Sequence, residues 1–316
     1  MKLIKQGIFM VEISKPFTRE EAMQHAIDCT KCRDEEATRK DLDNYSQALE
    51  QLERTGSEFH GDSIVALKSE ISKLENWLES DALKSGNYPI GIDRLMTELI
   101  EWRSVVYAID ETDFNDGLFN KSAFFAQWAV GAVYAINAII GKMVNQNSQD
   151  NSLRKLWNKV YIFIKRDGFA DKSEINALTT NFNGERFKND GSKVILYRNT
   201  SIAHNEKNTQ PKWSDVDEDL RILTRAWALI TSWCSYGLFN SLRCNEVAFM
   251  GLEKHFTPEQ MNQLYLKRLE YLGRIRAWGM HPIGHNLNPD DIKPLDLNKT
   301  YSLFGGNGPT ITTHLV

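Results

Sequence analysis

The segment from Leu196 to His204 combines side chains suited to chemistry on a phosphodiester. The guanidinium of Arg198 keeps its charge at physiological pH and can hold phosphate oxygens through paired hydrogen bonds. The imidazole of His204 can accept or donate a proton near neutral pH. Asn199 can position or hydrogen-bond the phosphate. These residue types predict metal-independent cleavage, in which His204 transfers a proton and Arg198 stabilises negative charge on the phosphate.

The spacing of Arg198 and His204 limits how they can meet. They are six positions apart, so on one regular α-helix their side chains would point about 120° apart. They converge if the helix stops between them, or if a second copy of the segment faces the first. The second arrangement predicts a symmetric dimer with a shared cleft.

The neighbours of the motif have weaker assignments. Apolar Val194, Ile195 and Leu196 precede it and predict an anchor in the core. Tyr197 and Ser201 are candidate RNA contacts, although Tyr197 also suits simple packing. The structural alternative for the whole motif is that Arg198 is an ordinary surface residue, the Asn199 amide is hydrogen-bonded at the end of a helix, and His204 caps a helix end.

The form Arg198-Asn199-x-x-x-Ala203-His204 resembles the motif of HEPN domains, in particular their abortive-infection-like branch. Ser152-Leu153-Arg154-Lys155-Leu156 resembles the segment that opens the preceding helix in that branch. The resemblance covers residues 90–242, about half of the chain. It implies a helical bundle, dimerisation and, often, metal-independent endoribonuclease activity. Some HEPN domains keep the fold without chemistry, so the fold alone does not decide function.

A helix expected from Asn151 or Ser152 onward carries basic residues that are candidate RNA contacts. The three assigned to RNA binding are Lys155, Lys159 and Arg166, and Arg154 and Lys165 share the side that we expect them to occupy. Such a face can form the wall of an RNA cleft. The alternative is an ordinary solvated helix face.

The composition is that of an ordinary globular protein and limits where nucleic acid could bind. The 316 residues are 41% hydrophobic and 25% charged, with a formal net charge of −4, so an RNA site must be a local basic cleft. Four cysteines are too few for a disulfide framework to hold together a chain of this size, and the composition predicts a cytoplasmic protein.

Two apolar runs bear on a membrane. The run Gly7–Val11 is too short for a secretory signal and is followed by Glu12. The run Ala123–Ile140 approaches the length of a membrane span but contains Gln127 and Asn137. We therefore predict a buried central helix there, and no membrane partner.

Apolar periodicity and capping residues predict an all-α protein. Thr18 and Ser214 are expected to cap helices, and Pro258 to occupy the first turn of another. The helical patterns cover residues 18–54, 62–80, 95–109, 119–144, 214–234 and 257–278. They predict an N-terminal helical hairpin within 1–86 and a C-terminal helix with an extended tail at 251–316. For the helices of 87–250, the resemblance implies a HEPN-like antiparallel bundle.

Two groups of residues have metal-like spacing. Cys29-Thr30-Lys31-Cys32 lacks the second pair that a zinc site needs, and His281-Pro282-Ile283-Gly284-His285 has the Pro and Gly of a loop. We therefore predict no metal and no cofactor.

By the resemblance to HEPN domains, the leading hypothesis is a metal-independent endoribonuclease of a defence or toxin system. The 2′-hydroxyl of RNA would attack the adjacent phosphate, with Arg198, Asn199 and His204 as catalytic residues and a 2′,3′-cyclic phosphate as product. The rival is a non-catalytic HEPN-type dimer that binds RNA or protein. A metal-dependent enzyme is a weaker third reading. Expected partners are RNA, a second copy of the chain or a higher homo-oligomer, and an antitoxin or sensor protein.

Overall fold

The fold is described from a computed structural model. It places residues 17–31, 33–55, 57–86, 88, 90–114, 122–147, 151–187, 191–204, 210–234, 241–243, 246–288, 292–296 and 300–302.

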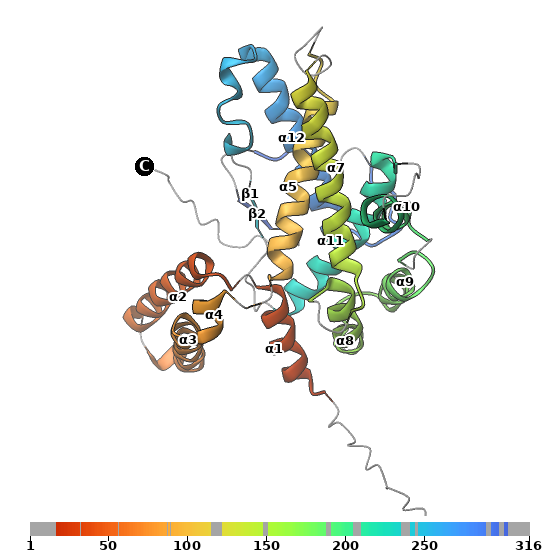
Figure 1. The fold of residues 1–316 in the computed structure, drawn as a ribbon. Helices are drawn as coiled ribbons and strands as arrows, with labels where there is room; N and C mark the ends of the chain where they lie inside the picture. The colour runs from red at the N-terminus through yellow and green to blue at the C-terminus, as the bar shows by residue number, and fades with distance from the viewer. Residues whose placement is uncertain are drawn as a thin grey trace, which may run out of the picture.

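The predicted all-α class is confirmed (Figure 1). One short antiparallel pair of strands, β1 (Ser241–Arg243) and β2 (Thr300–Ser302), accompanies the helices. The helices are α1 (Arg19–Thr30), α2 (Glu35–Thr55), α3 (Ser57–Leu78), α4 (Asp81–Ser85), α5 (Ile92–Asp110), α7 (Ala123–Val144), α8 (Leu153–Arg166), α9 (Lys172–Asn183), α10 (Lys193–Tyr197), the π-helix η1 (Arg198–Ile202), α11 (Trp213–Cys234), the 3₁₀-helices η2 (Glu246–Phe249) and η3 (Leu252–Lys254), and α12 (Pro258–Met280).

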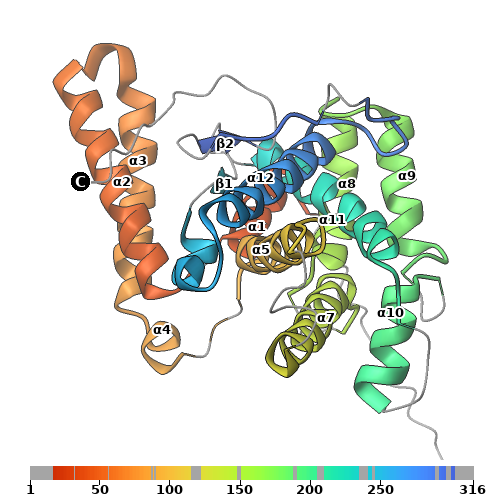
Figure 2. The same cartoon turned by 90° about the horizontal axis from the view of Figure 1, so that it is seen from above.

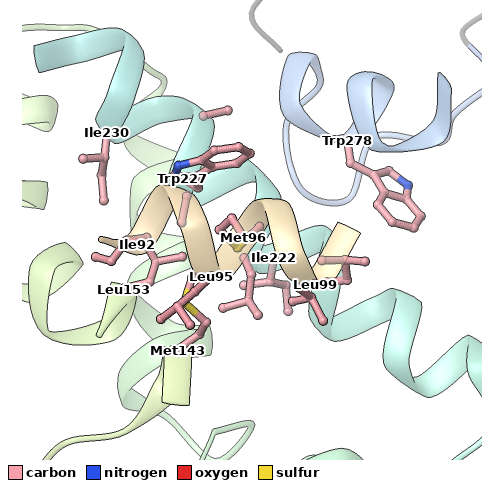
Figure 3. Packing of buried hydrophobic residues seen from close by; sticks show 14 of the residues in the cluster. Ile92, Leu95, Met96, Leu99, Met143, Leu153, Ile222, Trp227, Ile230 and Trp278 are labelled. Carbon is pink, nitrogen blue, oxygen red and sulfur yellow. The ribbon is translucent and has the colours of Figure 1, made fainter. Parts of the chain in front are cut away.

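Helix α5 lies at the centre of the body. Seen from above, it runs between α12 and α7 (Figure 2), and it contacts both of them and α1. Its apolar stripe, including Met96 and Leu99, packs against residues of α11 such as Ile222 and Trp227 (Figure 3). Burial of such stripes drives helix packing more strongly than helix propensity does.

Most of the predicted helix starts are confirmed. Thr18 and Thr257 each form a capping box. The threonine side-chain oxygen accepts a hydrogen bond from the backbone N–H of the third helical residue, and the side chain of that residue accepts one from the backbone N–H of the threonine. The Ser152 oxygen accepts from Lys155 N at 3.2 Å. The prediction that Ser214 caps a helix was wrong, because α11 begins at Trp213 and Ser214 lies inside it, and the Asp215 side chain accepts a hydrogen bond from Lys212 N.

The predicted helix 18–54 is broken into α1 and α2. Lys31 leaves the helical region, with φ −64° and ψ 136°, and Asp34 Oδ1 accepts a hydrogen bond from Ala37 N at 2.8 Å. A side chain that satisfies a free N–H in this way starts a new helix. The break lets α1 turn away from the hairpin, so that Ala22 and Ala26 are buried in the main core.

The body is larger than the predicted division of the chain at residues 86 and 250 implies. Helix α1 contacts α11, α8 and α5, and α12 contacts α5 and α11. The N-terminal hairpin consists of α2 and α3 with short α4, and it lies to one side of the body in both views (Figures 1 and 2). Within it, Ile64 and Leu74 are the buried apolar side chains of the described residues.

The described part of the C-terminal tail lies on α12. Leu295 N donates to Leu269 O at 3.3 Å, and the Leu295 side chain is buried in the core. The Lys293 carbonyl passes so close to Gly273 that a Cβ there would lie 2.3 Å from its oxygen. The glycine-rich segment 305–308 lies outside the described residues.

Helix α7 is only partly the buried central helix that its sequence predicts. Among the described residues it is the one helix long and apolar enough to cross a membrane. Its C-terminal part, including Ile136 and Ile140, is in the core, whereas Phe124 and Val130 are exposed. The first turns of α7 lie beside the end of α5 (Figure 1), where Phe125 packs against the cluster that includes Ala108.

Candidate functional site

The motif lies on α10 and η1, and a buried serine starts this segment. The Ser192 oxygen accepts hydrogen bonds from Val194 N at 3.1 Å and Ile195 N at 3.3 Å. Val194 and Ile195 are buried, as their apolar character predicts. The segment is therefore fixed at its N-terminal end by a cap and by core contacts.

Asp219 on α11 ties this segment to a second one. Its carboxylate accepts a short hydrogen bond from the Ser192 hydroxyl and one from Arg186 Nε at 2.8 Å. Asp219 is fully buried, and burial raises the pKa of its carboxyl, although Ser192 and Arg186 oppose that shift. Arg186 also donates to Glu218 at 2.7 Å. One carboxylate thus holds both α10 and the chain around Arg186 in place.

The helix neither stops between Arg198 and His204 nor stays regular. Residues 198–202 form a π-helix, and Ala203 N donates to Arg198 O across the wide turn. Thr200 Oγ1 donates to Leu196 O at 2.8 Å. Single π turns are frequent at functional sites, because they interrupt the regular ladder and redirect side chains.

Arg198 and Asn199 line an open, polar pocket of about 510 Å³. Arg198 Nη1 donates to Asn199 Oδ1 at 2.9 Å. The Arg198 side chain lies over Gly141 of α7, where a Cβ would approach its Nε to 2.9 Å. The pocket is lined by Gly141, Val144, Asn145, Gln146, Arg154, Glu185, Phe187, Ile195, Arg198 and Asn199.

Arg154 lines the pocket, although it is not among the site residues that the sequence predicts. Its sequence context predicts a place on the basic outer side of α8, but the residue is only 6% exposed. Its Nη1 donates to Phe187 O at 3.0 Å and to Val144 O at 3.4 Å. Burial lowers the pKa of the Arg154 guanidinium. The one sequence feature that could have pointed to Arg154 is the resemblance of residues 152–156 to the segment that opens the corresponding helix in HEPN domains.

His204 lies apart from the pocket. Its side chain is exposed, near the end of the described segment, and it does not line the cavity that Arg198 and Asn199 share. Tyr197 is half-buried and also outside the lining. Ser201 Oγ is buried and has no hydrogen-bond partner among the residues that the structure describes.

The basic residues of α8 face several directions. Lys155 Nζ donates to Asn147 O at 3.0 Å, near the pocket rim formed by Asn145 and Gln146. Lys159 is exposed and lies near enough to His25 of α1 to lower the pKa of that imidazole, together with burial. Arg166 stacks over the Phe163 ring at the far end of the helix. Of the three, Lys155 alone is close to the pocket rim.

The described residues contain no group of three His, Cys, Asp or Glu side chains that could hold a metal ion. His25 packs near Cys29, with Nε2 3.6 Å from Sγ. Burial raises the pKa of the Cys29 thiol, which disfavours the thiolate that metals bind. Cys32 lies outside the described residues. The rings of His281 and His285 stack with centroids 4.8 Å apart.

The chain was compared with protein-family models, curated proteins and solved structures. None of them matches. The motif and the pocket geometry are therefore the observations that bear on function.

Proposed function

We propose that this protein is a cytoplasmic, metal-independent endoribonuclease of a defence or toxin system. The observation that carries the proposal is the placement of Arg198 and Asn199 on a π-helical turn that lines a polar pocket of about 510 Å³. A pocket of this size accepts a ligand of small-molecule dimensions, such as one nucleotide. The motif's resemblance to HEPN domains gives the reaction class.

The proposed reaction is a transesterification within RNA. The 2′-oxygen attacks the neighbouring phosphorus, the bond from phosphorus to the 5′-oxygen breaks, and a 2′,3′-cyclic phosphate remains. Arg198 donates hydrogen bonds to the phosphate as negative charge builds on its oxygens. Asn199, bonded to Arg198 Nη1, keeps the guanidinium aimed at the pocket. His204 takes the 2′-hydroxyl proton while water protonates the departing 5′-oxygen, or it delivers a proton to that oxygen while water takes the 2′-hydroxyl proton.

His204 reaches the phosphate in this proposal only from a second subunit. Within one chain His204 is exposed and outside the pocket. The helix continues through the π turn to Ala203 and does not stop after Arg198, so the chain does not turn His204 back toward Arg198. A twofold-symmetric dimer that places each His204 at the partner's pocket completes the site.

Mixing of two inactive variants tests this arrangement directly. Arg198→Ala and His204→Ala are each expected to abolish cleavage of a random-sequence single-stranded RNA pool in the presence of EDTA. A mixed dimer has one pocket with an intact Arg198 and an intact His204 only if these residues come from different chains. If the subunits assort at random, the mixture should regain about a quarter of the wild-type rate.

The controls separate the mechanism from contamination. RNA with 2′-deoxy substitution should remain intact, and product ends should carry a 2′,3′-cyclic phosphate. A mixture that stays inactive although mixed dimers form would refute the composite site. Activity that survives His204→Ala, or that requires magnesium, would refute the mechanism.

The second candidate is a non-catalytic module that binds RNA or a protein. The position of His204 outside the pocket favours it. On this alternative, wild-type protein binds single-stranded RNA without cutting it, and His204→Ala does not change the affinity. An antitoxin or sensor protein is a proposed binding partner under either candidate function.

A further inference from the structure

The pocket contains a second guanidinium, Arg154, which the proposed reaction does not use. It is 6% exposed, and its Nη1 donates hydrogen bonds to Phe187 O at 3.0 Å and to Val144 O at 3.4 Å. These bonds fix the guanidinium at the wall of the pocket that Arg198 and Asn199 also line.

The charge of the lining favours an anion. Arg154 and Arg198 contribute two positive charges, and Glu185 contributes one negative charge. The lining is therefore net positive, in a chain whose formal net charge is −4. Main-chain carbonyls fix Arg154, and Asn199 accepts from Arg198 at 2.9 Å. Two oriented guanidinium groups in one cavity suit a ligand with two neighbouring phosphates.

The size of the cavity limits the form of that ligand. A volume of about 510 Å³ is in the range of small-ligand pockets and cannot hold a double helix. Bases that are not paired can be turned out of the strand into such a pocket. Amide groups of Asn145 and Gln146 on the wall offer donors and acceptors to a base or a sugar.

We infer that the pocket binds one nucleotide of a single strand together with both of its flanking phosphates, with Arg198 on the scissile phosphate and Arg154 on the adjoining one. The inference rests on the proposed function, because that function defines which phosphate is scissile. Arg154 is then a substrate-binding residue, and the size of the pocket sets the preference for single strands.

The first experiment uses wild-type protein alone. A short single-stranded RNA around a mapped cleavage position is made resistant by one 2′-deoxy sugar, and each phosphate in turn is replaced by a neutral methylphosphonate. Neutralising either of two adjacent phosphates is expected to weaken binding by about tenfold or more. A response at one phosphate only, or at none, would overturn the inference.

The second experiment links one of these phosphates to Arg154. In the Arg154→Gln variant, the methylphosphonate at the adjoining position should cost little further affinity, whereas the scissile position should respond as in the wild type. The slope of log affinity against log salt should fall by about 0.7, as expected for one lost contact to a single strand. Arg154→Lys should keep the slope, because the charge remains.

Arg39→Gln is the matched control, since Arg39 lies on α2 with a side chain 62% exposed and pairs with Glu35. It should change neither the slope nor the methylphosphonate pattern. If wild-type protein cleaves RNA but Arg154→Gln behaves like Arg39→Gln, this inference fails and the proposed function stands. If no RNA is cleaved, the proposed function fails. The methylphosphonate series is then made on a short single strand of arbitrary sequence, and binding that no neutral phosphate weakens refutes this inference as well.

Discussion

Arg198 owes its place in the pocket to a missing side chain on the neighbouring helix. Its aliphatic stem and Nε lie against Gly141, and a Cβ at that position would come within 2.9 Å of Nε. The contact involves a flexible side chain rather than main chain, so the arginine can move aside at low cost. A residue far from the motif in sequence thus controls where the guanidinium points.

Gly141→Ala is predicted to displace Arg198 and to slow RNA cleavage by about tenfold to a hundredfold, because small misplacements of a charge-stabilising group are costly in the transition state. Stability should not fall, since alanine is favoured over glycine within a helix by about 1 kcal/mol. Single-turnover rates and urea unfolding measure the two effects.

Gly131→Ala on the same helix is the control, because a Cβ there meets nothing within 4 Å. It should leave the cleavage rate unchanged. Equal rates for the two variants would show that Arg198 does not act from its observed position.

Asp93 is a residue whose burial predicts a pH effect. Its carboxylate accepts from Trp227 Nε1 at 2.6 Å, and burial raises the pKa of Asp93 to about 7 from its ordinary 3.8. Between those values the folded protein keeps a proton that the unfolded chain has lost. The free energy of unfolding should therefore fall as pH rises through this window, by up to about 1.4 kcal/mol per pH unit.

Asp93→Asn should remove this part of the pH dependence, which urea unfolding at pH 5 and pH 8 will measure. Asp215→Asn on α11 is the control. The hydrogen bond from Lys193 lowers the pKa of Asp215, so its carboxylate is ionised in both the folded and the unfolded protein over this pH range. Identical pH profiles for wild type and Asp93→Asn would contradict the assignment.

At the scale of elements, close approach of main chain to helix decides how the tail is held. The Lys293 carbonyl oxygen lies where a Cβ of residue 273 would need to be, and Leu295 is inserted into the core just beyond it. Helix α12 therefore serves both as a core helix and as the surface on which the tail docks.

Gly273→Ala is expected to lower the free energy of unfolding by about 1–3 kcal/mol, as overpacking does. The side chain would push main chain, which cannot move aside as a flexible side chain does. Urea unfolding measures the loss, and limited proteolysis should cut the tail sooner. Gly131→Ala again provides the unhindered comparison, and equal stability of the two variants would exclude a docked tail.

At the scale of the whole molecule, the chain has a large helical body and a hairpin that contributes nothing to its core. Among the described residues, neither hydrophobic cluster includes a member of α2, α3 or α4. Polar contacts link the hairpin to the body, such as the ion pair of Lys31, which follows α1, with Asp41 of α2 at 3.8 Å. Exposed polar pairs contribute little to stability.

Replacement of residues 37–88 by a short Gly-Ser linker should therefore leave a body that unfolds cooperatively, with a midpoint within about 5 °C of the full chain. Thermal unfolding followed by circular dichroism measures this. Ala26→Asp is the contrasting variant, because α1 lies in the core and a buried unpaired charge should destabilise the body strongly. Loss of cooperative unfolding in the shortened chain would show that the hairpin is part of the body.

The features that the sequence predicted correctly are local ones. The helical class and the starts at Thr18, Ser152 and Thr257 follow from apolar periodicity and from hydrogen bonds between residues three positions apart. The break at Asp34 was missed although it is also local, because the amphipathic pattern continues across it. The start of α11 was also predicted too late in the sequence.

The sequence by itself determined that this is an all-α chain carrying Arg198, Asn199 and His204 in one segment. The tertiary structure alone decided that Arg154 and Gly141 meet Arg198 at a pocket while His204 stays outside it, and that α1 and α12 join the core. The physical reason is that capping and periodicity act over a few residues. The pocket, in contrast, depends on which side chains from distant segments lie side by side. It also depends on a π turn that no local sequence pattern predicted.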